Sequence, residues 1–390
     1  MRQIKPVLFG CVLCALISCA RAGFPEASQG EEQREVGPFH ARPLSDADAV
    51  LHSHTMFASA DRQGFALVWT DMPPRALQLR LNFALLNAQG GVTLRREGVF
   101  FFEAGYHPSR WWLRPSGDGY LLFYHSEDWL HALRFNGEGW LQEQLEDIAG
   151  NMVQPSLFST PQGFGCAFRR LEDSYYQIKL QQLAPDGIAQ GGLVQIGATD
   201  SHQHSPQVVT TSQGLLASWY QGSPAHLLAV PLDETGGELA PANRPWTDES
   251  EMRSHRLISV DTGHVLATWT DLEDRLRAGL LDQNGQALWA EPIELIEPNR
   301  VESLSWTMRR YDGRLALAWE SDVDSVVNEL RFRWLEPTAS APNFGEVETL
   351  TDPGYEYCCP GMTTNDRALA ISFIGWHDGG KRLYLTTQVR

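Results

Sequence analysis

The sequence has little lysine, few cysteines and no long apolar segment in its main body. Only three of its 31 basic residues are lysines, and 48 acidic residues give a net charge of −17. A chain this acidic repels phosphate backbones, which excludes a general nucleic-acid binder. Three of the six cysteines lie within the first 19 residues, and the other three cannot form a disulfide framework. No stretch after the N-terminal region is apolar enough to cross a bilayer.

The motifs of several enzyme classes are also absent. The chain has no Gly-rich phosphate loop, no Gly-x-Ser-x-Gly elbow, no His-Glu-x-x-His and no Cys-x-x-Cys-His haem site. These absences exclude the corresponding nucleotide, hydrolase, metalloprotease and haem chemistries. The hydrophobic fraction of 43% and the 13 tryptophans instead indicate a folded chain with large amphipathic surfaces.

An export signal and a lipid attachment site are predicted at the N-terminus. Residues 1–18 combine a basic start with an apolar run that is too short for a membrane-spanning helix, as in signal peptides. The sequence LISC, which ends at Cys19, resembles the bacterial lipobox, where cleavage leaves a lipidated cysteine. Ordinary cleavage after Ala22 is the alternative. By resemblance to the lipoprotein sorting rule, Ala20 favours the outer membrane. We expect Cys19 to carry lipid and residues 19–35 to form a flexible tether.

A repeat along the rest of the chain predicts the fold. A turn residue followed by an apolar run that ends in an aromatic residue recurs at intervals of 44 to 55 residues. A period near this length is typical of propeller blades. Strand-like segments flank each copy, and no window sustains a helical period. The sequence therefore predicts an all-β, seven-bladed β-propeller with four antiparallel strands in each blade. The copies begin at Gly64, Gly119, Gly163, Gly214, Gly263, Gly313 and Asp366.

The two ends of the propeller are expected to meet in one blade. After the copy at Asp366, only one further strand-like segment follows, at residues 382–389. Residues 36–44 precede the first blade and have no blade of their own. We expect this N-terminal segment to complete the last blade, which closes the ring and removes its open edges. The propeller domain is predicted to span residues 36–390.

This predicted ring resembles the sialidase-like and BNR-type propellers of exported bacterial proteins. The resemblance covers residues 36–390 and concerns the architecture alone. The sialidase Asp-box, Ser-x-Asp-x-Gly-x-Thr-Trp, lies between the third and fourth strands of a blade. The corresponding sequence here, LDQNGQALW, has Gly285 and Trp289 at the wrong spacing. The WD-repeat signature is absent as well, so no family's catalytic residues carry over.

Two His-x-His pairs occupy equivalent positions ahead of their blade glycines. They are His52 with His54 in the first blade and His202 with His204 in the fourth. Residues i and i+2 of a strand point the same way, so each pair is predicted to present two imidazoles together. Neutral imidazole binds transition metals, which makes His202 and His204 the candidate metal ligands. Solvated loop histidines are the alternative, and the sequence requires no cofactor.

Other residues extend this candidate ligand-binding face. His107, Arg253, His255 and Tyr355 lie in the corresponding regions of other blades. The loops after the second strands are acidic, and by the propeller convention they lie on the same face. We expect these carboxylates to raise the proton affinity of the histidines and to suit a cationic partner. The acidic positions are Asp71, Glu127, Asp128, Glu172, Asp173, Asp271, Glu273, Asp274, Asp322, Asp324 and Asp378.

Two functions are compatible with such a face. The first is a binding or scaffold protein, held by lipid at the bacterial outer membrane, for a protein partner or a surface glycan. The second is an enzyme, either a polysaccharide lyase or a glycoside hydrolase. A lyase needs a base and a cation beside the uronate carboxylate, and His202, His204, Arg253 and Tyr355 have suitable side chains. An acidic rim disfavours a uronate polymer, and the fold does not choose between the two functions.

The remaining cysteines give two further expectations. Cys166 lies in an apolar run and is expected to be a small buried hydrophobe. The adjacent pair Cys358 and Cys359 is compatible with a strained vicinal disulfide or with two thiols on opposite faces of a strand.

Overall fold

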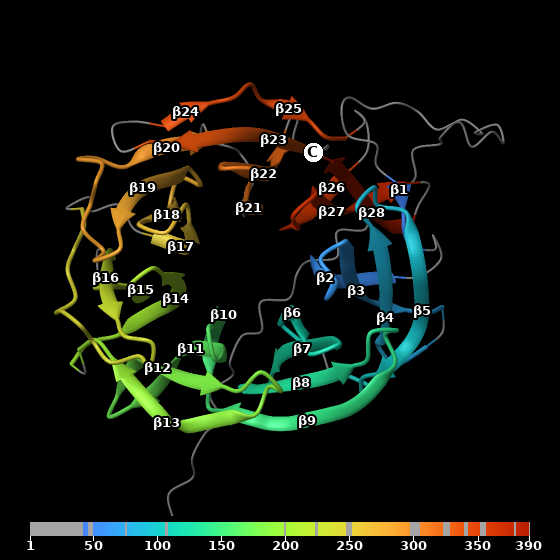
Figure 1. The fold of residues 1–390 in the computed structure, drawn as a ribbon, viewed down its shortest axis with the longest axis horizontal. Coiled ribbons are helices and arrows are strands. Elements are labelled where there is room, and N and C mark those ends of the chain that lie inside the picture. The colour runs from blue at the N-terminus through green and yellow to red at the C-terminus, as the bar shows by residue number, and fades with distance from the viewer. Residues whose placement is uncertain are drawn as a thin grey trace, which may run out of the picture. The chain divides into compact units, whose positions relative to one another are not determined.

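The chain folds into seven β-sheets arranged as blades around a central axis (Figure 1). The predicted seven-bladed propeller is therefore confirmed. In the described part of the chain every regular element is a strand, and no helix is present that could cross a membrane. The computed structural model describes residues 42–45, 50–74, 76–105, 108–198, 200–222, 225–246, 252–296, 305–322, 328–338, 342–351, 356–377 and 380–389.

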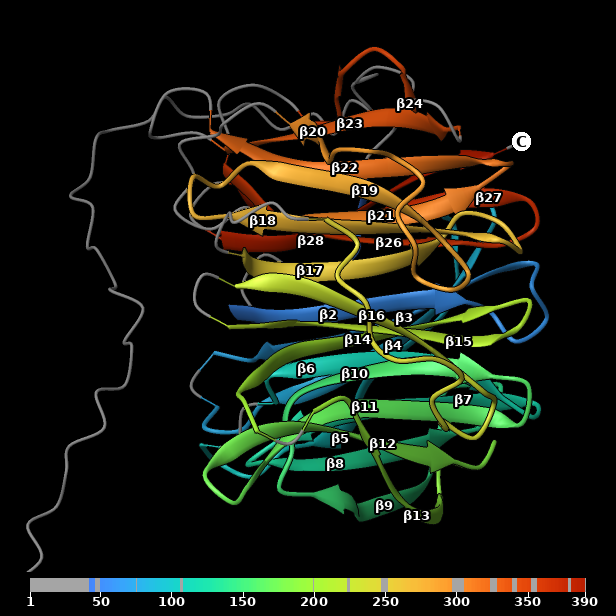
Figure 2. The same cartoon turned by 90° about the vertical axis from the view of Figure 1, so that its left-hand side faces the viewer.

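The first strand of each blade borders the centre of the ring (Figure 1). The strands run from one face of the ring to the other, so the connections between them gather on two opposite faces (Figure 2). The innermost strands are β2 (Val50–Ala58), β6 (Arg110–Ser116), β10 (Val153–Thr160), β14 (Gln203–Thr211), β17 (Met252–Ser259), β21 (Trp306–Tyr311) and β26 (Glu356–Thr364).

The second strand of each blade lies between two other strands and is the most buried. Trp69, Trp219 and Trp269 on these strands are almost completely inaccessible to solvent. Burial on both faces explains why these strands read as nearly continuous apolar runs. They are β3 (Gly64–Met72), β7 (Gly119–Ser126), β11 (Gly163–Glu172), β15 (Gly214–Gln221), β18 (His264–Asp271), β22 (Arg314–Asp322) and β27 (Ala368–His377).

The recurring glycine at the start of several second strands has a steric cause. A Cβ atom on Gly64 would overlap the carbonyl oxygen of Leu86, and one on Gly119 would overlap that of Phe135. Both carbonyls belong to the end of the third strand, which passes close to this turn. The sequence repeat therefore marks a close backbone approach that leaves no room for a side chain.

The third strands pair with the second strands in antiparallel register. Side-chain burial decreases from the third strands to the fourth strands, which lie on the outside of the ring and are more exposed. The third strands are β4 (Arg80–Asn87), β8 (Trp129–Phe135), β12 (Tyr175–Leu183), β16 (His226–Leu232), β19 (Leu276–Asp282), β23 (Asn328–Pro337) and β28 (Gly380–Val389).

The outermost strands vary most between blades. Among the described residues, the outer edge of the fourth blade is reduced to two isolated bridges, Leu232 with Glu238 and Ala229 with Asn243. The outer edge of the sixth blade is divided between two short strands. The outer strands are β5 (Val92–Phe101), β9 (Leu141–Gly150), β13 (Ala189–Ile196), β20 (Ile293–Ile296), β24 (Pro342–Phe344), β25 (Glu348–Thr349) and β1 (Arg42–Pro43).

The ring is closed by its N-terminal segment, as expected. In β1, Arg42 and Pro43 pair antiparallel with Leu385 and Tyr384 of β28. Hydrogen bonds continue beyond this strand: the amide of Leu44 donates to Leu383 O at 2.7 Å. The amide of Leu383 in turn donates to Ser45 Oγ at 2.9 Å. This pairing covers an edge of the last blade that would otherwise attract other chains. The predicted signal, lipidated cysteine and tether in residues 1–35 lie outside the described residues.

The hydrophobic core consists of clusters between neighbouring blades. Each cluster combines side chains from two blades that are adjacent in the ring, and every junction has one. The junction between the last and first blades is packed in the same way, with Leu67 and Trp69 against Leu383 and Leu385. Burial of both sheet faces therefore holds the blades to one another around the whole ring.

Two of the cysteine expectations can be compared with the structure. Cys166 is fully buried, as expected, and burial raises the pKa of its thiol to about 12. Cys358 and Cys359 are free thiols on β26, with Cys358 half-buried and Cys359 exposed. Cys359 has a left-handed backbone (φ 60°) at an irregularity between Cys358 and Gly361. The vicinal disulfide is not formed in this structure.

Candidate functional site

Several innermost strands contain a β-bulge near the end at which they enter the ring. In β10, β14 and β26 the bulge contains a left-handed residue followed by proline, at Gln154, Ser205 and Cys359. A left-handed backbone at such residues costs about 1–3 kcal/mol and persists where the surroundings enforce it. Bulges of this kind redirect side chains near functional sites. The bulges of β10 and β14 lie side by side at the junction of the third and fourth blades.

A cluster of polar and aromatic side chains lies at this junction. Arg169, near the end of β11, donates a hydrogen bond from Nη1 to His204 Nδ1 at 2.6 Å. The imidazole of His204 stacks on the ring of Tyr220, with centroids 5.3 Å apart and planes at 11°. A guanidinium can only donate, so Nδ1 of His204 bears a lone pair and its proton is on Nε2. We call Arg169, Tyr175, Tyr176, His202, His204 and Tyr220 the Arg169 cluster.

Two tyrosines of β12 extend this cluster toward solvent. The Arg169 guanidinium lies over the Tyr176 ring, 4.3 Å from its centroid. His202 contacts both tyrosines, with ring centroids 5.4 Å from Tyr175 and 5.8 Å from Tyr176. Tyr175 and His202 are exposed, whereas Tyr176 and Arg169 are half-buried. The result is a partly exposed aromatic surface with a cation held against it.

The bulge residues fix the position of the Tyr220 hydroxyl. Gln154 Oε1 accepts hydrogen bonds from the amide and the hydroxyl of Ser205, at 3.0 and 3.1 Å. Ser205 Oγ also lies 3.2 Å from the Tyr220 hydroxyl. These hydrogen bonds hold the Tyr220 hydroxyl beside Ser205.

His202 and His204 are brought together, as the sequence predicted, with ring centroids 6.3 Å apart. The two members of the first pair differ in their burial. In β2 the register passes from Leu51 directly to Ser53, which leaves His52 at a bulge. His52 is exposed, whereas Nε2 of His54 is buried beside Gly361 and has no hydrogen-bond partner among the described residues. The alternation rule fails here because the bulge changes the side-chain direction between the two histidines.

The remaining predicted site residues have different surroundings. His255 is buried on β17, where its Nε2 lies 2.9 Å from Ser218 Oγ and its ring meets Tyr220 edge-on. Its buried ring therefore packs against Tyr220 of the Arg169 cluster and does not face solvent. Arg253 is placed on β17 by its backbone. His107 and Tyr355 lie outside the described residues.

The histidine pKa values move in the opposite direction from the one expected. Burial lowers the pKa of His54 and of His255 to about 4. Burial, and secondly the charge of Arg169, lower the pKa of His204. The expectation that carboxylates raise these proton affinities is wrong for all three, because desolvation and a guanidinium dominate around them. All three imidazoles are neutral at pH 7.

The acidic loops contribute less free negative charge than the sequence suggested. Asp71 is buried and accepts from Arg80 at 2.8 Å, and Glu172 pairs with Lys179 at 2.6 Å. Asp271 is also buried and accepts from Arg275 at 2.8 Å, with a second arginine 3.1 Å away. Basic residues of the third strands thus neutralise several of these carboxylates. Asp324 and Asp378 lie outside the described residues.

The structure offers no preformed metal site in its described part. No group of three His, Cys, Asp or Glu side chains is placed there to hold a metal ion. Nδ1 of His204 already accepts a hydrogen bond from Arg169, which removes one of the nitrogens of the candidate metal pair. The interactions that the Arg169 cluster offers a ligand include hydrogen bonding, ring stacking and charge.

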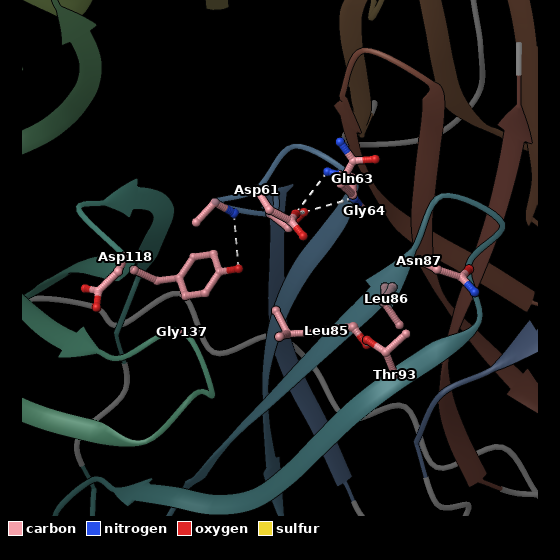
Figure 3. Close-up of a pocket in the computed structure, with 12 residues that line it drawn as sticks. Asp61, Gln63, Gly64, Leu85, Leu86, Asn87, Thr93, Asp118 and Gly137 are labelled. Atoms are coloured by element: carbon pink, nitrogen blue, oxygen red, sulfur yellow. Dashed lines mark hydrogen bonds between the residues drawn. The ribbon is translucent and has the colours of Figure 1, made fainter.

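A cavity of about 310 Å³ lies away from this cluster (Figure 3). It is formed by the turn that connects β2 to β3, the turn that connects β4 to β5, and the start of β7. The opposite ends of the strands form the Arg169 cluster, so the two sites are on different faces of the ring. Asp61 at the cavity accepts from Ser59 Oγ and the amide of Gln63, and the Tyr120 hydroxyl accepts from the amide of Ala60. These internal bonds occupy Asp61 and Tyr120, and Asp118 also lines the cavity.

Sequence reasoning missed Arg169, Tyr175, Tyr176 and Tyr220. These residues lie on second and third strands, whereas the residues predicted from the sequence lie on the approach to the first strands. One signal was present: the segment RRLEDSYYQ follows directly on the apolar strand of the third blade and combines arginine with two tyrosines. Its relation to His204, 35 positions later, depends on the packing of two blades.

Comparisons with known proteins identify the fold alone. No family model and no curated protein matches the chain. The WD40 domain of Toxoplasma gondii coronin is similar in structure, at 12% identity and a TM-score of 0.54, covering 92% of this chain and 88% of that one. Polysaccharide lyase Uly1 is similar at 8% identity and a TM-score of 0.53, covering 87% and 89%. A subtype N11 neuraminidase-like protein of A/flat-faced bat/Peru (H18N11) shares 10% identity, with a TM-score of 0.46 and coverage of 88% and 89%.

Proposed function

We propose that this propeller is a binding protein for a carboxylate-bearing glycan, which it holds at the Arg169 cluster. The observation that supports this function is the guanidinium of Arg169. It lies between Tyr176 and His204, and no described carboxylate pairs with it. A ligand carboxylate can accept charge-assisted hydrogen bonds from such a group. The neighbouring aromatic rings suit the apolar faces of sugar rings.

Three of the loop carboxylates do not argue against an acidic ligand. The sequence suggested a negative rim that repels uronates, but Asp71, Glu172 and Asp271 are paired with basic residues. Their charge is largely cancelled within each blade, which weakens repulsion of an approaching anion. A glycan is therefore favoured over a cationic protein segment as the partner.

The location of this function is proposed from the sequence. A lipid on Cys19 and a tether of residues 19–35 would hold the propeller at the bacterial outer membrane. A binding protein in this position meets glycans of the cell envelope or of the surroundings, and the tether leaves the Arg169 cluster free to approach them.

A second candidate function is a polysaccharide lyase at the same site. Arg169 would neutralise the uronate carboxylate. Tyr220, positioned by Ser205 and in its phenolate form, would take the proton from the sugar carbon beside that carboxylate and return it to the glycosidic oxygen as a C=C bond forms and the C–O bond to the leaving sugar breaks. The similarity to the lyase Uly1 is in keeping with this chemistry. Glycoside hydrolysis needs two available carboxylic groups, and the ion pairs of Asp71 and Asp271 do not favour it.

The test is a calorimetric titration with oligogalacturonate and, as a neutral control, with a glucan of the same length. We expect saturable binding of oligogalacturonate and no binding of the glucan. Tyr176→Ala removes the ring under the guanidinium and should weaken binding about tenfold or more. Absence of binding by the wild-type protein contradicts the proposal. Ultraviolet absorbance of an unsaturated uronate product during incubation separates the lyase from the binding protein.

A further inference from the structure

A separate group of arginines lies on the innermost strands. Arg110 and Arg114 are on β6, Arg256 is on β17 and Arg309 is on β21, and these strands border the centre of the ring (Figure 1). Arg110, Arg256 and Arg309 are exposed and Arg114 is half-buried, although many of their strand neighbours are buried. The four side chains therefore reach the solvent at the inner edge of their blades.

These charges act on one another across the ring. Desolvation by the surrounding blades, and secondly the charge of Arg309, lower the pKa of Arg114 to about 10. The same desolvation, followed by the charges of Arg309 and Arg110, lowers the pKa of Arg256 to about 10 although its side chain is partly open to solvent. The second blade, with Arg110 and Arg114, is not adjacent in the ring to the fifth or sixth blade. The arginines of the second blade and those of the fifth and sixth blades therefore interact electrostatically across the central axis.

The partners of the four arginines are neutral. Arg110 Nη1 donates to Pro155 O at 2.8 Å, and Arg309 Nη1 donates to Met308 O at 2.8 Å. Arg114 lies over Phe57 and Arg256 lies over Trp306, with centroid distances of 4.8 and 4.6 Å. Within the described ranges, none of the four forms an ion pair with a carboxylate. Four positive charges thus lie on strands that border the centre of the ring, in a protein whose net charge is −17.

We propose that the centre of the ring binds a doubly charged oxyanion of the sulfate or phosphate type between Arg114, Arg256 and Arg309. Guanidinium groups offer several N–H donors in a fixed plane and remain charged at neutral pH. A tetrahedral dianion has oxygens in several directions, so it can accept hydrogen bonds from side chains that approach from different blades. A carboxylate has two oxygens in one plane and accepts hydrogen bonds from fewer of these guanidinium donors. The site is independent of the Arg169 cluster and of the glycan proposed there.

The oxyanion is either a free ion or an ester group on a larger molecule, and both have the same binding chemistry. The experiment is a calorimetric titration of the full-length protein in detergent with inorganic sulfate, inorganic phosphate and a monosaccharide sulfate, each in chloride buffer of constant ionic strength. Saturable binding is expected for at least one of them. Tighter binding of inorganic sulfate or phosphate identifies a free ion as the ligand. Tighter binding of the monosaccharide sulfate identifies an ester group on a larger molecule.

Variants assign the binding to these residues. Arg256→Gln/Arg309→Gln should weaken it at least tenfold, since charge-assisted hydrogen bonds are lost. Arg310→Gln is the matched control, because Arg310 is the exposed neighbour of Arg309 on the same strand. Arg114→Gln gives a second test from another blade if the double variant does not fold. Absence of saturable binding, or equal affinity in the wild type, the double variant and Arg114→Gln, would overturn the proposal.

Discussion

The guanidinium of Arg169 donates a 2.6 Å hydrogen bond to Nδ1 of His204. The two residues belong to different blades, since Arg169 is on the second strand of one and His204 on the first strand of the next. The bond fixes the tautomer of the histidine and holds the cation beside Tyr176. The candidate binding surface is thus a product of blade packing.

Arg169 is expected to control both the ligand and the histidine. Arg169→Gln should weaken oligogalacturonate binding at least tenfold, because a charge-assisted hydrogen bond is lost. It should also raise the pKa of His204, since the guanidinium is one of the groups that lower it. Calorimetry and NMR titration of the imidazole measure the two effects. Arg170→Gln, one residue away, is the control. Equal losses in both variants would show that Arg169 has no specific role.

His255 is expected to limit stability in acid. Burial lowers its folded pKa to about 4, below the ordinary value of 6.5. The unfolded chain therefore binds more protons between these values, so stability is complete above pH 6.5 and declines as the pH falls toward 4. From pH 7.5 to 5 the loss is about 2 kcal/mol of unfolding free energy. His255→Gln should remove this part of the loss in urea unfolding experiments. An identical pH dependence in both proteins would refute the assignment.

Ring closure is expected to depend on a short segment. Deletion of residues 36–44 removes β1 and its bonds to Leu383 and Leu385, which exposes an edge of the last blade. The melting temperature should fall by several degrees, whereas deletion of residues 20–34 should leave it nearly unchanged. Differential scanning calorimetry of both truncations makes the comparison. Equal melting temperatures would mean that the segment does not stabilise the ring.

The anchor proposal depends on Cys19. Cys19→Ala removes the thiol that the lipobox-like sequence offers for acylation. The variant should lose labelling by radioactive palmitate and move from the membrane fraction to the soluble fraction. Membrane fractionation that is unchanged in this variant would exclude a lipid anchor at this position.

The fold could be predicted because its signal is local and repeated. The blade glycine recurs where the third strand leaves no room for a Cβ, and the second strands are apolar because both of their faces are buried. The closing strand was also predictable, since residues 36–44 had no other blade to join. The ladder register of β1 with β28 agrees with that expectation.

The candidate site was only partly predictable because it depends on geometry between blades. The pair of His202 and His204 was found from spacing, but the bulge at His52, which gives His52 and His54 different surroundings, leaves no comparable sequence pattern. The sequence does not show that Asp71 and Asp271 are neutralised, because the fold brings the arginines that pair with them into contact. The central arginines lie at different distances from their blade glycines, so no repeat reveals them.

A crystal structure of the propeller with an oligogalacturonate tests the central claim most directly. The account predicts that a ligand carboxylate accepts hydrogen bonds from Arg169 and that a sugar ring contacts Tyr175 or Tyr176. The same crystals of Arg169→Gln should show no ordered ligand at this position. The account would be contradicted if the oligosaccharide bound elsewhere on the wild-type protein. It would also be contradicted if the Arg169 cluster stayed empty at saturating ligand.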